Sequence, residues 1–243
     1  TRTGSTWTRQ QELTASDGLS GDPVAISGHD YFGSSVAING DVIVVGAKGD
    51  DDKGRESGSA YVFIRKGSIW TQRQKLIASD GARDAHFGSA IALSSDGTIV
   101  VGGAKPIWAY GKDPSGGVYV FTRTGSTWTQ QGKLTTNDGA AGYFFGSAVA
   151  IEGDAIVVGS HGVTVITQGI SWDYWNYWTT GSAYLFTRKG STWTQHSKLV
   201  AKDAKKGNYF GFSVCVRGNS VAIGANVHGA VYVFHANPPS ASS

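Results

Sequence analysis

The chain has 243 residues, of which 40% are hydrophobic, 16% are charged and 35 are glycine, and its formal net charge at pH 7 is +3. This length is ample for a sizeable core, and the charge is too small to indicate nucleic-acid binding by itself. No run approaches the roughly 18 apolar residues of a membrane helix, and the single cysteine, Cys215, excludes an internal disulfide. The chain has no methionine and no signal-peptide pattern, which we interpret as a processed product.

The first eight residues, Thr1 to Thr8, are identical to Thr122 to Thr129. The interior copy follows a Tyr-Val-Phe stretch, whereas the last such stretch, Tyr232 to Phe234, is followed only by a tail. A repeat whose end is supplied by the beginning of the chain indicates a closed ring. We therefore expect the N-terminal strand to complete the last repeat.

Each of four repeats contains four segments with the character of β-strands. The repeats open with Phe-Gly, at Phe32, Phe87, Phe145 and Phe210. The first segment alternates larger aliphatic residues with small ones, as a strand does, and a turn rich in Gly, Asn and Asp follows it. The second segment is apolar without alternation, which indicates a strand covered on both faces. The third carries Tyr-Val-Phe or Tyr-Leu-Phe, and the fourth is polar, which is typical of an outer edge.

Four such strands per repeat, stacked face to face around an axis, predict an all-β fold. The expected architecture is a four-bladed β-propeller of four-stranded antiparallel blades, with the ring closed by the N-terminal strand completing the last blade. Residues 1–243 would form a single domain. The expected blades are residues 32–78, 87–136, 145–201, and 210–234 plus 5–15, with residues 236–243 as a flexible tail.

Phe32 to Ala37, Val44 to Ala47 and Gly58 to Phe63 together resemble the FG-GAP repeat, and the resemblance extends over nearly the whole chain. Such repeats form the propeller of integrin α subunits and recur in surface proteins and some lectins. The resemblance implies a propeller for adhesion or ligand binding, located outside the cell or at its surface. Four blades are fewer than in the integrin-like ring, so that ring's partner surface does not carry over. The family's calcium loop, Asp-x-Asp-x-Asp-Gly-x-x-Asp, has no full match here.

The repeats differ most in the connection between the second and third segments, which lies on the same face as the connections between blades. We call this face the loop face. In the third repeat the connection holds five aromatic residues within Trp172 to Trp178, and Trp108 and Tyr110 lie in that of the second. Exposed Trp and Tyr side chains stack on sugar rings, and Asp173 and Asn176 suit hydroxyl groups. The predicted ligand-binding residues are Trp108, Tyr110, Trp172, Asp173, Tyr174, Trp175, Asn176, Tyr177 and Trp178.

The composition of these loops favours a non-catalytic binding or adhesion module that recognises carbohydrate. Two further hypotheses stay open. The aromatic loop could dock another protein, in a structural subunit, a homo-oligomer or a fragment of a surface assembly, or it could form a local core. A polysaccharide-active enzyme is the third hypothesis, although a nucleophile elbow, a P-loop and a dinucleotide fingerprint are absent from the sequence.

Acidic residues gather in the corresponding loop of the first repeat. Asp50, Asp52 and Glu56 alternate around Gly54, and calcium prefers such oxygen ligands in a flexible turn. We predict a calcium site there, with a solvated acidic loop as the alternative. No other cofactor is expected.

Two other features recur in the repeats and are interpreted as structural. Aspartate recurs at one position before each connection between blades, which predicts a turn-capping role for Asp17, Asp80, Asp138 and Asp203. On the opposite face, which we call the hairpin face, four turns carry a basic residue. We interpret these as solvated hairpin residues, Arg2, Arg65, Arg123 and Arg188.

Overall fold

The computed structural model describes residues 2–3, 5–18, 29–103, 116–137, 144–162, 180–203, 205, 207–227 and 229–236. The secondary structure of these residues consists of seventeen β-strands. None of them lies in a helix with the length and apolarity that crossing a membrane requires.

The strands form four antiparallel sheets, one for each repeat, and a short N-terminal hairpin of β1 (Arg2–Thr3) and β2 (Thr6–Trp7). Blade 1 consists of β3 (Phe32–Asn39), β4 (Val42–Ala47), β5 (Ser59–Lys66) and β6 (Ile69–Leu76). Blade 2 consists of β7 (Phe87–Leu93), β8 (Ile99–Gly103), β9 (Gly117–Thr124) and β10 (Thr127–Leu134). Blade 3 consists of β11 (Ala148–Glu152), β12 (Ala155–Ser160), β13 (Ser182–Lys189) and β14 (Thr192–Leu199). Blade 4 has three strands, β15 (Phe210–Arg217), β16 (Ser220–Ala225) and β17 (Ala230–His235).

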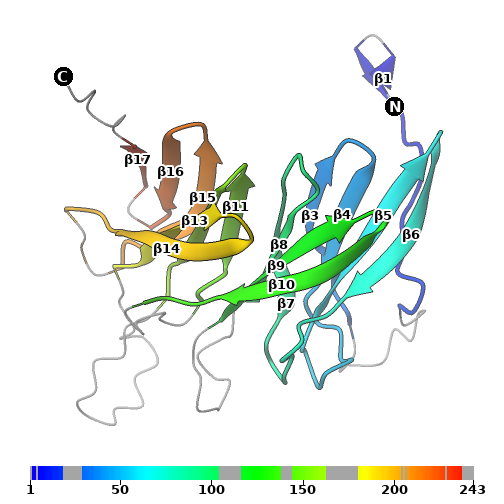
Figure 1. Cartoon of the computed structure of the whole chain (residues 1–243), viewed down its shortest axis with the longest axis horizontal. Helices are drawn as coiled ribbons and strands as arrows, with labels where there is room; N and C mark the ends of the chain where they lie inside the picture. Colours follow the sequence, from blue (N-terminus) through cyan, green and yellow to red (C-terminus); the bar gives the residue numbers. More distant parts are fainter. Residues whose placement is uncertain are drawn as a thin grey trace.

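The sheets stand side by side in a row in the order of the chain, from blade 1 to blade 4 (Figure 1). Within each blade, strands that follow one another in the sequence are neighbours in the sheet. The all-β prediction of antiparallel blades, one per repeat, is confirmed, and these are the blades of a propeller.

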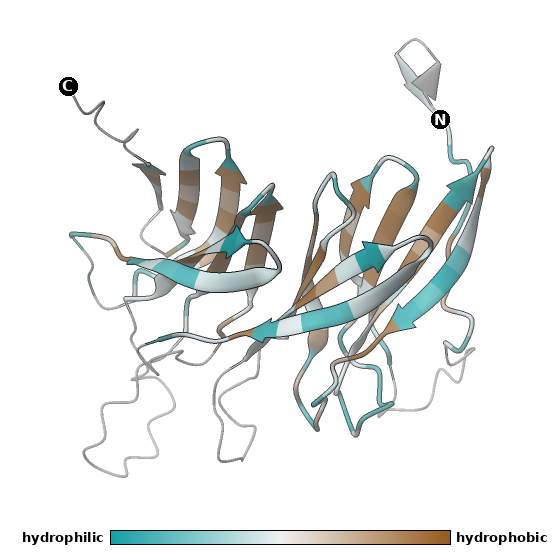
Figure 2. Cartoon of the chain, viewed as in Figure 1, coloured by the Kyte–Doolittle hydropathy of each residue, from teal (hydrophilic) through white to brown (hydrophobic). Residues whose placement is uncertain are grey.

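The position of a strand within its blade follows from its apolar pattern. The second strand, as in β8, is buried along its whole length because neighbouring blades cover both of its faces. The outer strand β10 instead alternates between exposed and less exposed residues, as a strand with one solvated face does. Figure 2 shows the same difference as hydrophobic colour on the inner strands and hydrophilic colour on much of β6 and β10.

Each pair of neighbouring blades shares one buried apolar cluster. Between blades 1 and 2, Val44 and Val62 pack in a cluster with Phe87 and Trp128. Similar clusters join blade 2 to blade 3 and blade 3 to blade 4. The hydrophobic cores therefore lie between the sheets, and burial there is the main force that holds the blades together.

Glycine pairs bring neighbouring blades into close contact near their inner strands. A Cβ atom added to Gly46 would lie 2.0 Å from the carbonyl oxygen of Gly88 in the next blade. The same distance separates a Cβ on Gly102 from the carbonyl oxygen of Gly146. Only a residue without a side chain fits such a contact.

The two ends of the row do not meet in this structure. Thr6 of β2 pairs with Thr3 of β1, and β17 has β16 as its one partner strand among the described residues. The first strand, β1, and the last strand, β17, lie at opposite ends of the row (Figure 1). Closure of the ring by residues 5–15 is thus not shown here and stays a prediction. Residues 237–243 of the expected tail lie outside the described part of the chain.

The glycine contacts can be tested with two alanine substitutions in blade 2. Gly102→Ala should lower the free energy of unfolding by about 2 to 3 kcal/mol, because its Cβ would overlap the backbone of blade 3. Gly132→Ala is the matched control, since nothing lies within 4 Å of a Cβ there. Urea unfolding measures both variants, and an equal effect of the two would contradict the proposed role of the close contact.

Candidate functional site

The acidic residues of blade 1 lie in the loop that joins β4 to β5. Asp50 is buried at 4% exposure, while Asp52 is exposed. The loop is folded on itself through two hydrogen bonds to Asp50. The amide of Gly58 donates to the carbonyl of Asp50 at 2.8 Å, and the amide of Asp52 donates to the carboxylate of Asp50 at 3.1 Å. The carboxylates therefore have fixed positions.

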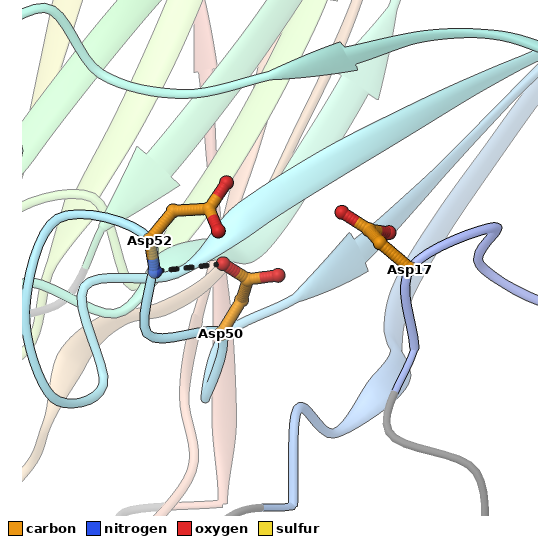
Figure 3. A group of neighbouring side chains, drawn as sticks. All are labelled: Asp17, Asp50 and Asp52. Atoms are coloured by element: carbon orange, nitrogen blue, oxygen red, sulfur yellow. Dashed lines mark hydrogen bonds between the residues drawn. The ribbon is translucent and has the colours of Figure 1, made fainter.

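The ammonium group of Lys75, on β6, lies at the centre of three carboxylates. Its Nζ atom is 2.8 Å from Asp17, 2.8 Å from Asp50 and 2.7 Å from Asp52. Figure 3 shows these three side chains approaching one another from the loop after β4 and from the N-terminal segment. The hydroxyl of Tyr61 donates to Asp50 at 2.9 Å, and the Lys75 ammonium also lies 5.3 Å from the centre of the Tyr61 ring.

Hydrogen bonding decides the protonation of this cluster. Burial by itself would raise the pKa of Asp50, but hydrogen bonds from Lys75, the Asp52 amide and Tyr61 outweigh it and keep the pKa below its ordinary value. Burial would likewise lower the pKa of Lys75, yet the three carboxylates raise it. At neutral pH the cluster therefore holds an ammonium ion beside the ionised carboxylates of Asp17 and Asp50.

The structure brings together two of the three residues of the predicted calcium site. Asp50 and Asp52 meet at Lys75, and Asp17 joins them, which makes the one potential metal-binding group among the described residues. Glu56 instead lies 2.9 Å from the imidazole of His86. Because Lys75 occupies the cation position, these side chains do not fit a calcium ion as they are arranged. The predicted calcium site stays a prediction, and it would require Lys75 to leave.

The same acidic loop also joins blade 1 to blade 2. The amide of His86 donates to the carbonyl of Glu56 at 2.9 Å, and the amide of Phe87 donates to the carbonyl of Ser57 at 3.0 Å. The side-chain contact with His86 is the main reason that the pKa of Glu56 lies below its ordinary value. The loop therefore acts as a structural bridge.

A lysine placed over a tyrosine recurs in the next blades. The ammonium of Lys133 lies 5.5 Å from the Tyr119 ring, and that of Lys198 lies 5.4 Å from the Tyr184 ring. Lys133 also pairs with Asp80 at 2.9 Å. Asp17 and Asp80 thus each bind the lysine of the blade that follows them, and the turn-capping interpretation misses this contact. Asp138 lies outside the described residues, and Asp203 accepts a hydrogen bond from Tyr232 at 2.9 Å.

The chain matches the FG-GAP repeat over residues 7–63, 70–121, 128–186 and 193–234. It belongs to the FG-GAP repeat family. The first FG-GAP unit begins at Trp7 of β2, and the other three begin at the tryptophan of an outer strand. Each unit ends in the third strand of the blade that follows, so the units are offset from the blades by one strand.

The residue before each Phe-Gly of the FG-GAP units has a left-handed backbone. These residues are Tyr31, His86, Phe144 and Tyr209, with φ between 50° and 70°. Bulky side chains rarely adopt this conformation, which costs on the order of 1 kcal/mol or more each. The carbonyl of each accepts a hydrogen bond from the amide three residues later, which fixes the turn into the inner strand at the loop face.

Two of these residues take part in an aromatic cluster at the loop face of blades 3 and 4. The imidazole of His161 stacks on the Phe144 ring at 5.0 Å and lies 5.1 Å from Phe212 and 6.1 Å from Tyr209. Its Nδ1 atom is 2.8 Å from the Ser147 hydroxyl. Burial lowers the pKa of His161 to about 4, so the ring is neutral at physiological pH.

The residues predicted to bind carbohydrate lie outside the described part of the chain. This holds for Trp108 and Tyr110 in the connection from Gly103 to Gly116, and for all seven positions from Trp172 to Trp178. His161 and Gly162 are the last described residues before the third-blade connection, and His161 belongs to the aromatic cluster.

Sequence reasoning missed Lys75 and His161. Lys75, Lys133 and Lys198 occupy one position in the repeats, as the recurring aspartates do, and this paired recurrence is a signal for an ion pair. His161 has no such signal because it occurs in one repeat only.

The hairpin-face arginines with described side chains are engaged in internal contacts. Arg65 lies over Trp70 at 5.4 Å and pairs with Asp41 at 2.7 Å. Arg123 lies over Trp128 at 4.9 Å, and Arg188 over Trp193 at 5.2 Å. Their position on the tryptophan rings supports a structural interpretation.

Removal of the central lysine tests the cluster. Lys75→Met should lower the free energy of unfolding by about 3 kcal/mol, because it leaves the buried Asp50 carboxylate without its ammonium partner. Lys133→Met is the matched control and should cost about 1 kcal/mol or less, since Asp80 is exposed. Urea unfolding at pH 7 gives both values, and equal losses would contradict the special position of Lys75.

The neutral state of His161 predicts a pH dependence of stability. Because its pKa is lowered in the fold, the unfolded chain binds more protons than the folded chain between about pH 6.5 and 4. Stability should therefore fall as the pH falls through this range, by about 2 kcal/mol at pH 5 relative to pH 7 from this residue. His161→Phe should reduce that loss, whereas His196→Gln, at an exposed histidine of β14, should not. A slope unchanged by His161→Phe would refute the assignment.

Proposed function

We propose that this FG-GAP chain is a non-catalytic binding or adhesion module that recognises carbohydrate through the aromatic loops of the loop face, outside the cell or at its surface. The FG-GAP repeats support a propeller of the binding type. Function on a rigid scaffold is usually carried by the loops that differ between repeats.

The observation that carries the proposal is the aromatic character of the loop face. Phe212 is 45% exposed and Tyr31 is 56% exposed, although both side chains carry a large aromatic ring. Phe212 belongs to the His161 cluster, which adjoins the connection that contains Trp172, Trp175 and Trp178. Aromatic rings held on a rigid base provide contact area for sugar rings at a small cost in conformational entropy.

Charges in the described part of the chain support binding over hydrolysis. Hydrolysis of a glycosidic bond usually needs two carboxyl groups that flank the substrate. The three carboxylates that cluster in the described part of the chain, those of Asp17, Asp50 and Asp52, are bound to Lys75. Ser147, whose hydroxyl contacts His161, occupies the same position in its repeat as Ser89. Because the Ser89 hydroxyl donates to the carbonyl of Gly102, this position favours a structural role for the serine over a catalytic one.

A glycan array tests the proposal directly. The Trp172→Ala, Trp175→Ala, Trp178→Ala triple variant should lose at least about tenfold in affinity for any glycan that the wild type binds, because stacking contributes about 1.5 kcal/mol or more. Ile69→Ala, at a 62% exposed position by the hairpin face, is the matched control. Binding that survives the triple change would eliminate the aromatic platform. Mass measurement in solution addresses protein docking, since a stable assembly that dissociates in the triple variant would favour that alternative.

A further inference from the structure

Two residues that depart from the repeat meet at the loop face between blades 3 and 4. Phe212 follows the fourth Phe-Gly, and the other repeats have a serine there, namely Ser34, Ser89 and Ser147. His161 directly follows β12, and the equivalent residues of the other repeats are Lys48, Ala104 and Asn226. The rings of Phe212 and His161 lie 5.1 Å apart. A requirement of the fold that all repeats share does not account for this contact, because it joins the exceptional residues of two blades.

The backbone of the inner strand fixes the position of Phe212. The pairing of β15 with β16 shifts between Phe210 and Ser213, so Phe212 lies in a β-bulge. The amide of Phe212 donates to the carbonyl of Tyr209 at 3.2 Å, which closes the turn before the bulge. A bulge changes the direction of a side chain relative to a regular strand. Here it presents an aromatic ring that is 45% exposed.

The same bulge in blade 2 shows what the phenylalanine replaces. The pairing of β7 with β8 shifts between Phe87 and Ala90, and the bulge contains Ser89. The hydroxyl of Ser89 donates to the carbonyl of Gly102 at 3.1 Å. Phe212 has no hydroxyl group for such a bond. Blade 4 therefore has an exposed ring where blade 2 has an internal hydrogen bond, and this exchange adds surface for a ligand.

His161 supports the ring of Phe212 from blade 3. The imidazole stacks on Phe144 at 5.0 Å with an interplanar angle of 17°, and its Nδ1 atom lies 2.8 Å from the Ser147 hydroxyl. The ring of Phe212 is inclined to the imidazole by 57°, and the ring of Tyr209 lies 6.1 Å from it. Burial lowers the pKa of His161 to about 4, so the support brings no positive charge at physiological pH.

These features fit a ligand that has one apolar face, hydroxyl groups at its edge and no charge. A pyranose ring presents its C–H groups on one face, and an aromatic side chain stacks on that face. Tyr209 and Ser213 lie close to Phe212 in the chain and both carry hydroxyl groups, and Ser213 is exposed. A protein partner would typically bury about 800 Å² on each side. One exposed ring with a half-buried support is nearer to the size of a single sugar.

We propose that Phe212, supported by His161 and flanked by Tyr209, stacks on one uncharged pyranose ring at the boundary of blades 3 and 4. The inference rests on the proposed function and adds to it a contact residue that belongs to a strand. Phe212 is the residue that touches the sugar, and His161 is a positioning residue that acts through Phe212. The sugar class follows from the neutral aromatic surroundings, which offer no charge to an acidic or basic sugar.

NMR titration with three neutral sugars tests the site. The probes are methyl β-galactopyranoside, methyl β-glucopyranoside and methyl α-mannopyranoside. At least one should shift the imidazole resonances of His161, and saturation transfer to that sugar gives its Kd. Phe212→Ser, which introduces the residue of the other three repeats, should raise Kd at least about fivefold because stacking is lost. Val233→Ser, at a 58% exposed position of β17, is the matched control and should leave Kd unchanged.

Two changes at position 161 test the positioning role. His161→Ala should weaken binding as Phe212→Ser does, whereas His161→Phe should retain it, because a second aromatic ring still supports Phe212. Equal losses in the two position-161 variants would contradict this role. The site itself would be overturned by the absence of a His161 shift with all three sugars, or by an unchanged Kd in Phe212→Ser.

The glycan array separates this inference from the proposed function. Array binding that is lost in the Trp172, Trp175 and Trp178 triple variant but unchanged in Phe212→Ser would overturn the inference and leave the proposed platform intact. Array binding that is lost in Phe212→Ser but unchanged in the triple variant would support the inference and eliminate the loop platform. Loss in both variants supports one site to which the strand and the loop contribute.

Discussion

Face-to-face packing of neighbouring blades is the contact on which the rest of the structure depends. A single sheet of three or four strands cannot bury both of its faces, and the second strands of these blades are apolar on both. Stacking solves this problem three times, and glycine pairs such as Gly102 and Gly146 let the backbones approach. Each blade is therefore stable only next to another blade.

The charged residues extend the same contact outwards from the core. Lys133 reaches from its own tyrosine to Asp80, which follows the last strand of blade 1, and Lys75 reaches from Tyr61 to Asp17 of the N-terminal segment. Glutamine side chains such as Gln74 continue the contact along the outer strands. Because these polar groups are used between blades, they are not available for a ligand. The proposed function therefore rests on the loops that do not take part in this repeated pattern.

Much of the fold follows from the sequence because four copies repeat each signal. The Phe-Gly openings, the turns and the polar outer strands occur in every copy, so chance agreement with a pattern is small. The site is less predictable because it depends on single residues. Nothing in the sequence near His161 indicates that it packs between Phe144 and Phe212, and the three oxygens around Lys75 come from segments more than thirty residues apart.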